Sequence, residues 1–353
     1  MKIILTNILK IAVFGLYFLL PHIAVANCYN IGATGRLANY CALDKLRNTK
    51  VDLRSLRFID QKLKFEGRVK GLGFPSLKKV SSVSKNIYPI LAYSDNINGG
   101  NSSEPLVIGN NTFLSDETLY RKEGVVAGMG ANLNGRYTYS KRRYVSYGIS
   151  SSHTRSPKYG IGISSINASL CSINHIKDWW YIDACAYTSA TNKKISDSKN
   201  NNISLMGSKV YSGVENVYNE AIFGMNLYLA EKYTQKQLLV GYNNVYSNSL
   251  YSSVNLTLGE EVENQLTMQH AIRAKITTKF ANKPLKLSLN YSHLSGGVLL
   301  GVEYNRRDYE ISASYPVRGN LTVNLGYKNS KSNINYYSSS TPIFGIYFKP
   351  FTF

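Results

Sequence analysis

The sequence predicts an all-β fold: a transmembrane antiparallel β-barrel of about fourteen strands behind a short, partly helical N-terminal periplasmic segment. The first observation is a period-two alternation that continues almost to the C-terminal Phe353. In Leu321 to Tyr327, for example, Leu, Val, Leu and Tyr alternate with Thr, Asn and Gly. Such a period places one strand face in an apolar medium and the other in a polar one. The second observation is an export signal at the other end of the chain.

Residues 1–26 have the features of a secretory signal peptide. Lys2 and Lys10 supply positive charge, Ile11 to Leu20 is apolar, and Ala24-Val-Ala26 is a small-x-small cleavage site. The apolar run is short for a membrane helix of about 20 residues. We therefore expect a mature chain that starts at Asn27 and reaches the outer membrane of a Gram-negative bacterium.

The composition agrees with a barrel in lipid. Hydrophobic residues make up 44% of the chain, yet the mean hydropathy is −0.20, because apolar residues alternate with Ser, Asn and Gly. The 28 Tyr, against 2 Trp and 12 Phe, suit interfacial aromatic girdles. A soluble β-sandwich with many edge tyrosines is the alternative.

The formal net charge is +20. The basic residues of the chain are scattered over turns and polar strand faces, as in Lys141-Arg-Arg143, Lys193-Lys194 and Arg306-Arg307, and they form no nucleic-acid motif. We expect no nucleic-acid partner. The predicted partners are outer-membrane lipids and lipopolysaccharide around the barrel, or anions in a cationic lumen, and the predicted state is a monomer.

The four cysteines fall into two local pairs, Cys28 with Cys41 and Cys171 with Cys185. An exported chain enters an oxidising compartment, so two disulfides are predicted, with pairing by proximity. Free thiols are the alternative. The second pair flanks Ile176 to Trp179, where a turn would bring adjacent strands within bridging distance.

Residues 27–85 form the predicted periplasmic segment. Tyr40 to Arg47 and Leu53 to Leu63 carry apolar residues at spacings of three and four, which predicts helical turns. Gly71 to Pro75 and Lys78 to Lys85 have the composition of a linker.

Residues 86–353 form the predicted barrel. The tight connections Ala281 to Pro284 and Val317 to Asn320 are assigned to the periplasmic side, and the polar stretches Asn192 to Asn202 and Ser295 to Arg307 to long outer loops. The longest connection, Asp95 to Thr118, is expected to fold over or into the mouth.

Short motifs at both ends of the barrel resemble the surface lipoprotein assembly modifier (Slam-like) family. The first motif, Tyr93 to Gly100, contains Asp95, Asn96, Asn98, Gly99 and Gly100, and is followed by Asn101 to Ile108 and Leu114 to Asp116. The segments Gly301 to Asp308, Tyr327 to Ile334 and Ile346 to Phe351 are similar to the end of that family's barrel.

The resemblance implies a fourteen-stranded translocator that helps a surface lipoprotein or secreted protein across the outer membrane. Known members carry a periplasmic repeat domain, for which residues 27–85 have no room. The alternative is a passive porin or solute channel with a cationic lumen.

No enzyme, metal or cofactor is predicted. The mature histidines His153, His175, His270 and His293 lack metal-ligand spacing, and no phosphate-binding or nucleophile motif is found. His293-Leu-Ser295 with distant Asn305 resembles the catalytic residues of outer-membrane phospholipase A. That family's twelve strands disagree with the predicted count.

A charge cluster precedes the alternation of Tyr309, Ile311, Ala313 and Tyr315. Its members are Glu303, Arg306, Arg307, Asp308 and Glu310. If those four side chains face lipid, the same parity turns Arg306, Asp308 and Glu310 inward and Arg307 outward. A charge facing lipid at mid-membrane costs about 2–4 kcal/mol, so Arg307 is expected at or above the interface. Arg306 is expected to fold toward the lumen against Glu303, Asp308 or Glu310. A solvated loop pair on the rim is the alternative.

Overall fold

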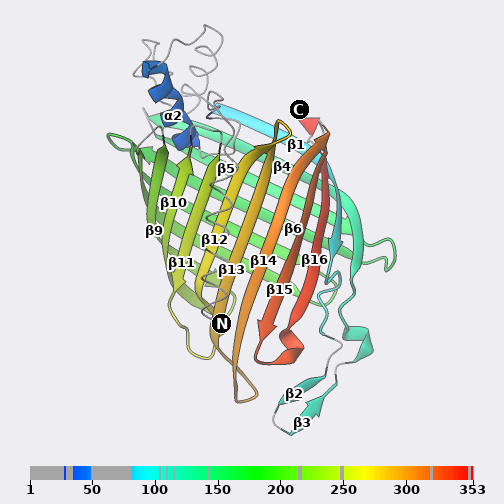
Figure 1. Cartoon of the computed structure of the whole chain (residues 1–353). Helices are drawn as coiled ribbons and strands as arrows, with labels where there is room; N and C mark the ends of the chain where they lie inside the picture. The colour runs from blue at the N-terminus through cyan, green and yellow to red at the C-terminus, as the bar shows by residue number, and fades with distance from the viewer. Residues whose placement is uncertain are drawn as a thin grey trace.

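A computed structural model describes residues 28, 35–48, 81–102, 105–108, 110–114, 116–140, 143–213, 217–246, 250–318, 321–348 and 351–352. The predicted signal peptide and the predicted helical turn at Leu53 to Leu63 lie outside these residues. The described chain forms a closed antiparallel β-barrel (Figure 1). Its sheet has 15 named strands, and β17 continues β16 along the same neighbour, so the barrel has fourteen strands, as predicted.

The strands coincide with the alternating segments of the sequence, and several strands are a few residues longer than the alternation itself. The barrel strands are β1 Ser81–Ser94, β4 Gly124–Ser140, β5 Arg143–Arg155, β6 Gly162–His175, β7 Trp180–Asn192, β8 Asp197–Ser212, β9 Tyr218–Ala230, β10 Thr234–Val245, β11 Tyr251–Gly259, β12 Thr267–Phe280, β13 Lys283–Leu299, β14 Val302–Arg318, β15 Leu321–Ser332, β16 Ser339–Phe348 and β17 Phe351–Thr352. The other elements are α2 Gly35–Asn48, β2 Leu106–Ile108, β3 Asn111–Phe113, and the 3-10 turns η1 Glu117–Leu119 and η2 Asn335–Tyr337. The predicted helix at Tyr40 to Arg47 is confirmed within α2.

The barrel closes between its first and last strands. Ile90, Leu91 and Ala92 of β1 pair with Tyr347, Ile346 and Gly345 of β16, and β17 pairs with β1 further along. On its other side β1 pairs with β4 over its whole length. Closure leaves no edge of unpaired backbone groups, which hydrocarbon would not solvate.

The two ends of the barrel differ. The C-terminus and α2 lie at the top of Figure 1, and the β2–β3 hairpin projects from the bottom. Short turns mark the periplasmic side of outer-membrane barrels, so the top end is periplasmic. The predicted long loops Asn192 to Asn202 and Ser295 to Arg307 are wrong, because β8 begins at Asp197 and β13 runs to Leu299. Polar residues of these two stretches instead belong to paired strands that continue beyond the apolar band of the barrel.

The two faces of each strand separate as a membrane barrel requires. In β7, Trp180 and Ile182 are exposed, whereas Tyr181, Asp183 and Cys185, which have the opposite parity, are buried. Large apolar side chains remain exposed around the whole barrel, including Met129, Leu205 and Met225. Because they share one parity across every paired strand, they form the lipid-facing surface of an outer-membrane protein.

This parity predicts opposite results for arginine at neighbouring positions of β14. Ile311 is 61% exposed on the outward face, and Ser312 has the opposite parity. Ile311→Arg is expected to lower the free energy of unfolding by about 2–4 kcal/mol, because the charge would enter the apolar band. Ser312→Arg should leave it nearly unchanged. Urea titration of protein folded into vesicles measures both values, and equal losses would contradict the assignment.

Both predicted disulfides are present. Cys28 is bonded to Cys41 of α2, and Cys171 of β6 is bonded to Cys185 of β7. The second pair sits directly opposite in the β6–β7 register, as the intervening turn predicts.

Candidate functional site

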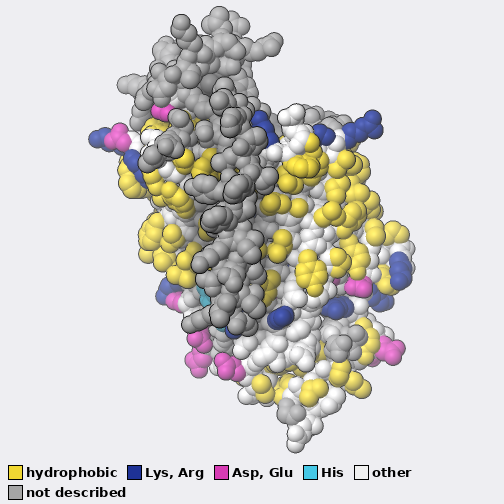
Figure 2. Space-filling model, viewed as in Figure 1, with side chains coloured by type: hydrophobic (Ala, Val, Ile, Leu, Met, Phe, Trp, Pro, Cys, Tyr) yellow, Lys and Arg dark blue, Asp and Glu magenta, His cyan; other side chains and the backbone are white. Residues whose placement is uncertain are grey.

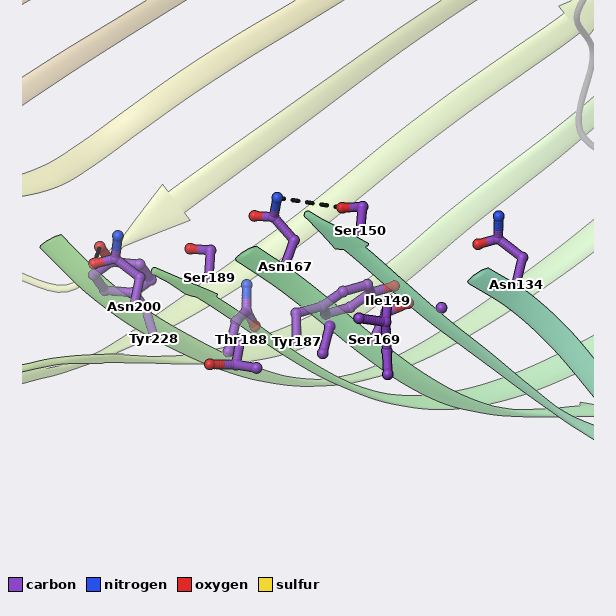
Figure 3. Close-up of a pocket in the computed structure, with 13 residues that line it drawn as sticks. Asn134, Ile149, Ser150, Asn167, Ser169, Tyr187, Thr188, Ser189, Asn200 and Tyr228 are labelled. Atoms are coloured by element: carbon purple, nitrogen blue, oxygen red, sulfur yellow. Dashed lines mark hydrogen bonds between the residues drawn. The ribbon is translucent and has the colours of Figure 1, made fainter. Parts of the chain in front are cut away.

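The inner wall of the barrel carries the groups that could handle a solute. On β4 to β9 it holds a cavity of about 490 Å³ (Figure 3). The side chains that line it are uncharged amides, hydroxyls and phenols, among them Asn134, Ser150, Asn167, Ser169, Tyr187, Ser189, Asn200, Asn202 and Tyr228. Tyr228 donates its hydroxyl to Asn200 Oδ1 at 2.5 Å. This cavity offers hydrogen bonds without charge.

The opposite half of the wall is basic. Five exposed basic residues share the inward parity of β12, β13 and β15: Arg273, Lys275, Lys279, Lys286 and Lys328. We call them the basic track. Their exposure inside a closed barrel means that they face the water of the lumen. The same wall also carries two inward carboxylates, Asp308 and Glu310 of β14, and Glu310 is the direct register partner of Lys328. Because basic residues outnumber the acidic ones, a solute passing through meets net positive charge on this side and neutral polar groups at the cavity on the other.

The predicted charge cluster is divided between the two surfaces. Arg306 forms an ion pair with Asp308 at 3.1 Å, and Glu310 accepts a hydrogen bond from Asn290 at 3.2 Å. These three residues share the inward parity. Arg307 has the outward parity and pairs with His293 and Lys331. The main-chain oxygen of Glu303 accepts from Asn333 near the outer end of β14.

The Asp95 to Gly100 motif forms a compact turn at the outer mouth. Asn96 and Gly100 exchange two hydrogen bonds, with distances of 2.8 and 2.9 Å. Asn98, 1% exposed, accepts from the main-chain N–H of Lys122 and donates to the carbonyl of Tyr120, both at 2.8 Å. The motif's amides therefore fix a loop shape.

This turn reaches across part of the outer mouth. Its carbonyls at Asn98 and Asn96 accept hydrogen bonds from Ile195 N–H at 2.9 Å and Lys193 Nζ at 2.8 Å. Both donors lie in the β7–β8 turn, beyond β4, β5 and β6 in sheet order. Burial lowers the pKa of Lys193, with a smaller opposing effect from Asp95. The first part of the connection, Asp95 to Gly100, thus folds over the mouth as expected and brings Lys193 to it, whereas the β2–β3 hairpin of the same connection projects away from the barrel (Figure 1).

At the periplasmic mouth, α2 is tied to the inner wall by Arg36. Its guanidinium forms an ion pair with Asp183, lies 3.8 Å from Glu220, and donates to Ser208 Oγ at 2.7 Å. Glu220 is 2% exposed and also accepts from Asn243 at 3.0 Å. The positive charge of Arg36 thus compensates the negative charge of two carboxylates that are buried in the barrel wall.

Packing completes the attachment of α2. Leu37 and Cys41, both 0% exposed, belong to one buried cluster with Tyr181, Val210, Tyr218, Val245 and Tyr251 of the strand ends. Tyr40 packs edge-on against Trp179, with ring centroids 4.7 Å apart. Tyr218 donates its hydroxyl to Asp44 at 3.0 Å. All these wall residues lie at the ends of β7 to β11, so α2 covers the periplasmic mouth on that side.

Several of these residues were missed by sequence reasoning. The basic track could have been found by projecting parity through each strand, since Arg273 and Lys275 alternate with Ile272 and Ala274. Arg36 and Lys193 carry no such signal, because one lies on a helix and the other in a turn.

The histidines do not assemble a catalytic or metal site in the described part of the chain. His293 Nδ1 has no hydrogen-bond partner in that part of the chain. The described residues contain no group of three potential metal ligands. Among them, no helix has both the length and the apolar character to cross a membrane.

Comparison with known proteins gives similarity of fold at low identity. No family model matches the sequence, and no curated protein matches it. The high-pH structure of Pseudomonas putida OprB is 8% identical, with a TM-score of 0.44, over 77% of this chain and 94% of that one. Pseudomonas aeruginosa OccK10 (OpdN) is 7% identical, with a TM-score of 0.43, over 76% of this chain and 98% of that one. A BenF-like porin from Pseudomonas fluorescens Pf-5 is 7% identical, with a TM-score of 0.41, over 77% and 99%. The chemistry of the wall must come from this chain's own residues.

Proposed function

We propose that this protein is a passive outer-membrane channel for small, polar, anionic solutes. The observation that carries the proposal is the basic track, Arg273, Lys275, Lys279, Lys286 and Lys328, exposed on one inner wall. Across the lumen, the uncharged cavity of about 490 Å³ supplies hydrogen bonds for hydroxyl or carbonyl groups. A ring or wall of lysine and arginine attracts anions and disfavours cations in a pore.

Reversing charge on the basic track should reverse ion selectivity. Purified wild-type protein in planar bilayers under a salt gradient is expected to give an anion-selective reversal potential. Arg273→Glu with Lys275→Glu should shift it toward cation selectivity, because four charge units change on the inner wall. Lys199→Glu with Lys236→Glu is the matched control, since both lysines have the outward parity. Cation selectivity in the wild type, or equal shifts in both doubles, would refute the proposal.

Protein export, which the Slam-like resemblance implies, is the rival proposal. The fourteen strands that this resemblance implies equal the number of strands in this barrel. Deleting the gene and comparing surface proteomes with solute uptake separates the two. Loss of one surface or secreted protein with unchanged uptake supports export, whereas slower anion uptake with an intact surface proteome supports the channel.

A further inference from the structure

Four basic side chains line up on the outward surface of the barrel. His270 of β12 pairs with His293 of β13, which pairs with Arg307 of β14, which pairs with Lys331 of β15. We call them the basic row. The two imidazole rings are 5.1 Å apart. Among the described residues, Arg307 and Lys331 form no ion pair, and the nearest acidic residue on the same face of β14 is Glu303, four positions away.

The basic row lies at the outer boundary of the apolar band. Ten residues separate His270 from Phe280 near the periplasmic end of β12. At about 3.3 Å per residue and a tilt of about 40°, that is roughly 25 Å of height, the thickness of the band. Tyr291 and Tyr309, with ring centroids 5.0 Å apart, occupy the next outward row, as an interfacial girdle does. In Figure 2, dark blue and cyan side chains appear toward the bottom of the yellow band.

An apolar groove lies below this girdle on the same strands. Its volume is about 500 Å³, and Ala274, Ile276, Leu287, Leu289, Ile311 and Leu325 line it. On β12 to β15 these residues occupy the first and second outward rows beyond the tyrosine row. Two cations, Arg307 and Lys331, lie with two imidazoles at the interface, next to a groove in the hydrocarbon region. This arrangement matches an amphiphile with an anionic head and an acyl chain.

We propose that the outward face of β12 to β15 binds a phosphorylated lipid of the outer leaflet. Arg307 and Lys331 hold the phosphates through charge-assisted hydrogen bonds, the two imidazoles offer further N–H donors, and one acyl chain occupies the groove. The position of the row at the extracellular boundary selects the outer leaflet as the source. Charge complementarity selects a phosphorylated lipid over a neutral one. The proposal concerns the lipid surface and does not depend on what crosses the lumen.

Lipid titration of the purified full-length protein in detergent tests this site. The probes are bisphosphorylated lipid A, dephosphorylated lipid A and inorganic pyrophosphate, with bound lipid counted by native mass spectrometry. Wild-type protein is expected to prefer the bisphosphorylated form by about tenfold or more. Arg307→Ala with Lys331→Ala should lose that preference, and Lys199→Ala with Lys236→Ala, two outward lysines on other strands, should keep it.

A second variant tests the groove. Ala274→Phe with Ala313→Phe adds side-chain volume to it and leaves the basic row intact, so affinity for bisphosphorylated lipid A should also fall. Heat-modifiable migration confirms that each variant is folded. Equal affinity of the Arg307/Lys331 variant and the wild type would overturn the proposal. So would unchanged binding after the groove is filled, or full competition by pyrophosphate, which would show a free-anion site.

Discussion

Arg36→Ala is expected to release α2 from the periplasmic mouth and to raise single-channel conductance. The side chains of Asp183 and Glu220 are 9% and 2% exposed, and Arg36 is the cation that the structure places between them. Removing one partner from a buried ion pair costs about 3–5 kcal/mol, because the remaining charge stays desolvated. The barrel itself is held by fourteen paired strands, so the helix should undock before the sheet opens.

Conductance in planar bilayers and protease sensitivity of α2 measure this release together. Arg318→Ala is the matched control, because Arg318 is exposed at the periplasmic end of β14 and carries the same charge. Arg36→Lys should give an intermediate result, since an ammonium lacks the planar fork that reaches several acceptors. If Arg36→Ala leaves both conductance and protease protection at wild-type values, the ion pairs do not hold the helix.

Asn98→Ala is expected to free the turn at the outer mouth and to change conductance there. The substitution removes the acceptor for Lys122 N–H and the donor to the Tyr120 carbonyl in a site where Asn98 is 1% exposed. Each buried group left without a partner costs about 1–3 kcal/mol. The turn also anchors Lys193, so its release should weaken anion selectivity as well as widen the mouth.

Reversal potential and conductance of Asn98→Ala, recorded beside Thr112→Ala, provide the measurement. Thr112 is exposed in β3, on the projecting hairpin away from the turn, so its loss should change neither value. Asn98→Asp keeps an acceptor for Lys122 N–H but lacks the amide donor, and should fall between the two. Wild-type conductance and selectivity in Asn98→Ala would show that the turn does not narrow the pore.

Much of the barrel could be predicted because its determinants are local. A strand in lipid needs alternate residues to be apolar, so a segment such as Leu285 to Tyr291 reveals both its conformation and its outward face. The Cys171–Cys185 bridge was predictable for the same reason, because a short turn brings neighbouring strands into register. The loop assignments failed where polarity was taken as the end of a strand, since β13 and β14 continue past the membrane to Leu299 and Val302.

The functional surfaces depend on register, which the local pattern does not contain. Arg273 and Lys328 lie three strands apart, and they share a wall only because the pairing of β12 to β15 fixes both their heights and their parity. The basic row on the outside likewise requires His270, His293, Arg307 and Lys331 to meet at one height. A slip of one residue in any of these strands would turn its charge to the other face.

The sequence by itself determined an exported, closed antiparallel barrel, its lipid-facing parity and its disulfide pairs, because each follows from short-range periodicity or spacing. Only the tertiary structure decided what fills the two mouths. Arg36 meets Asp183 across 147 residues, and Asn98 meets the β7–β8 turn across nearly a hundred. Such contacts arise where a closed cylinder brings the ends of distant strands around one opening, and no local repeat in the chain encodes that encounter.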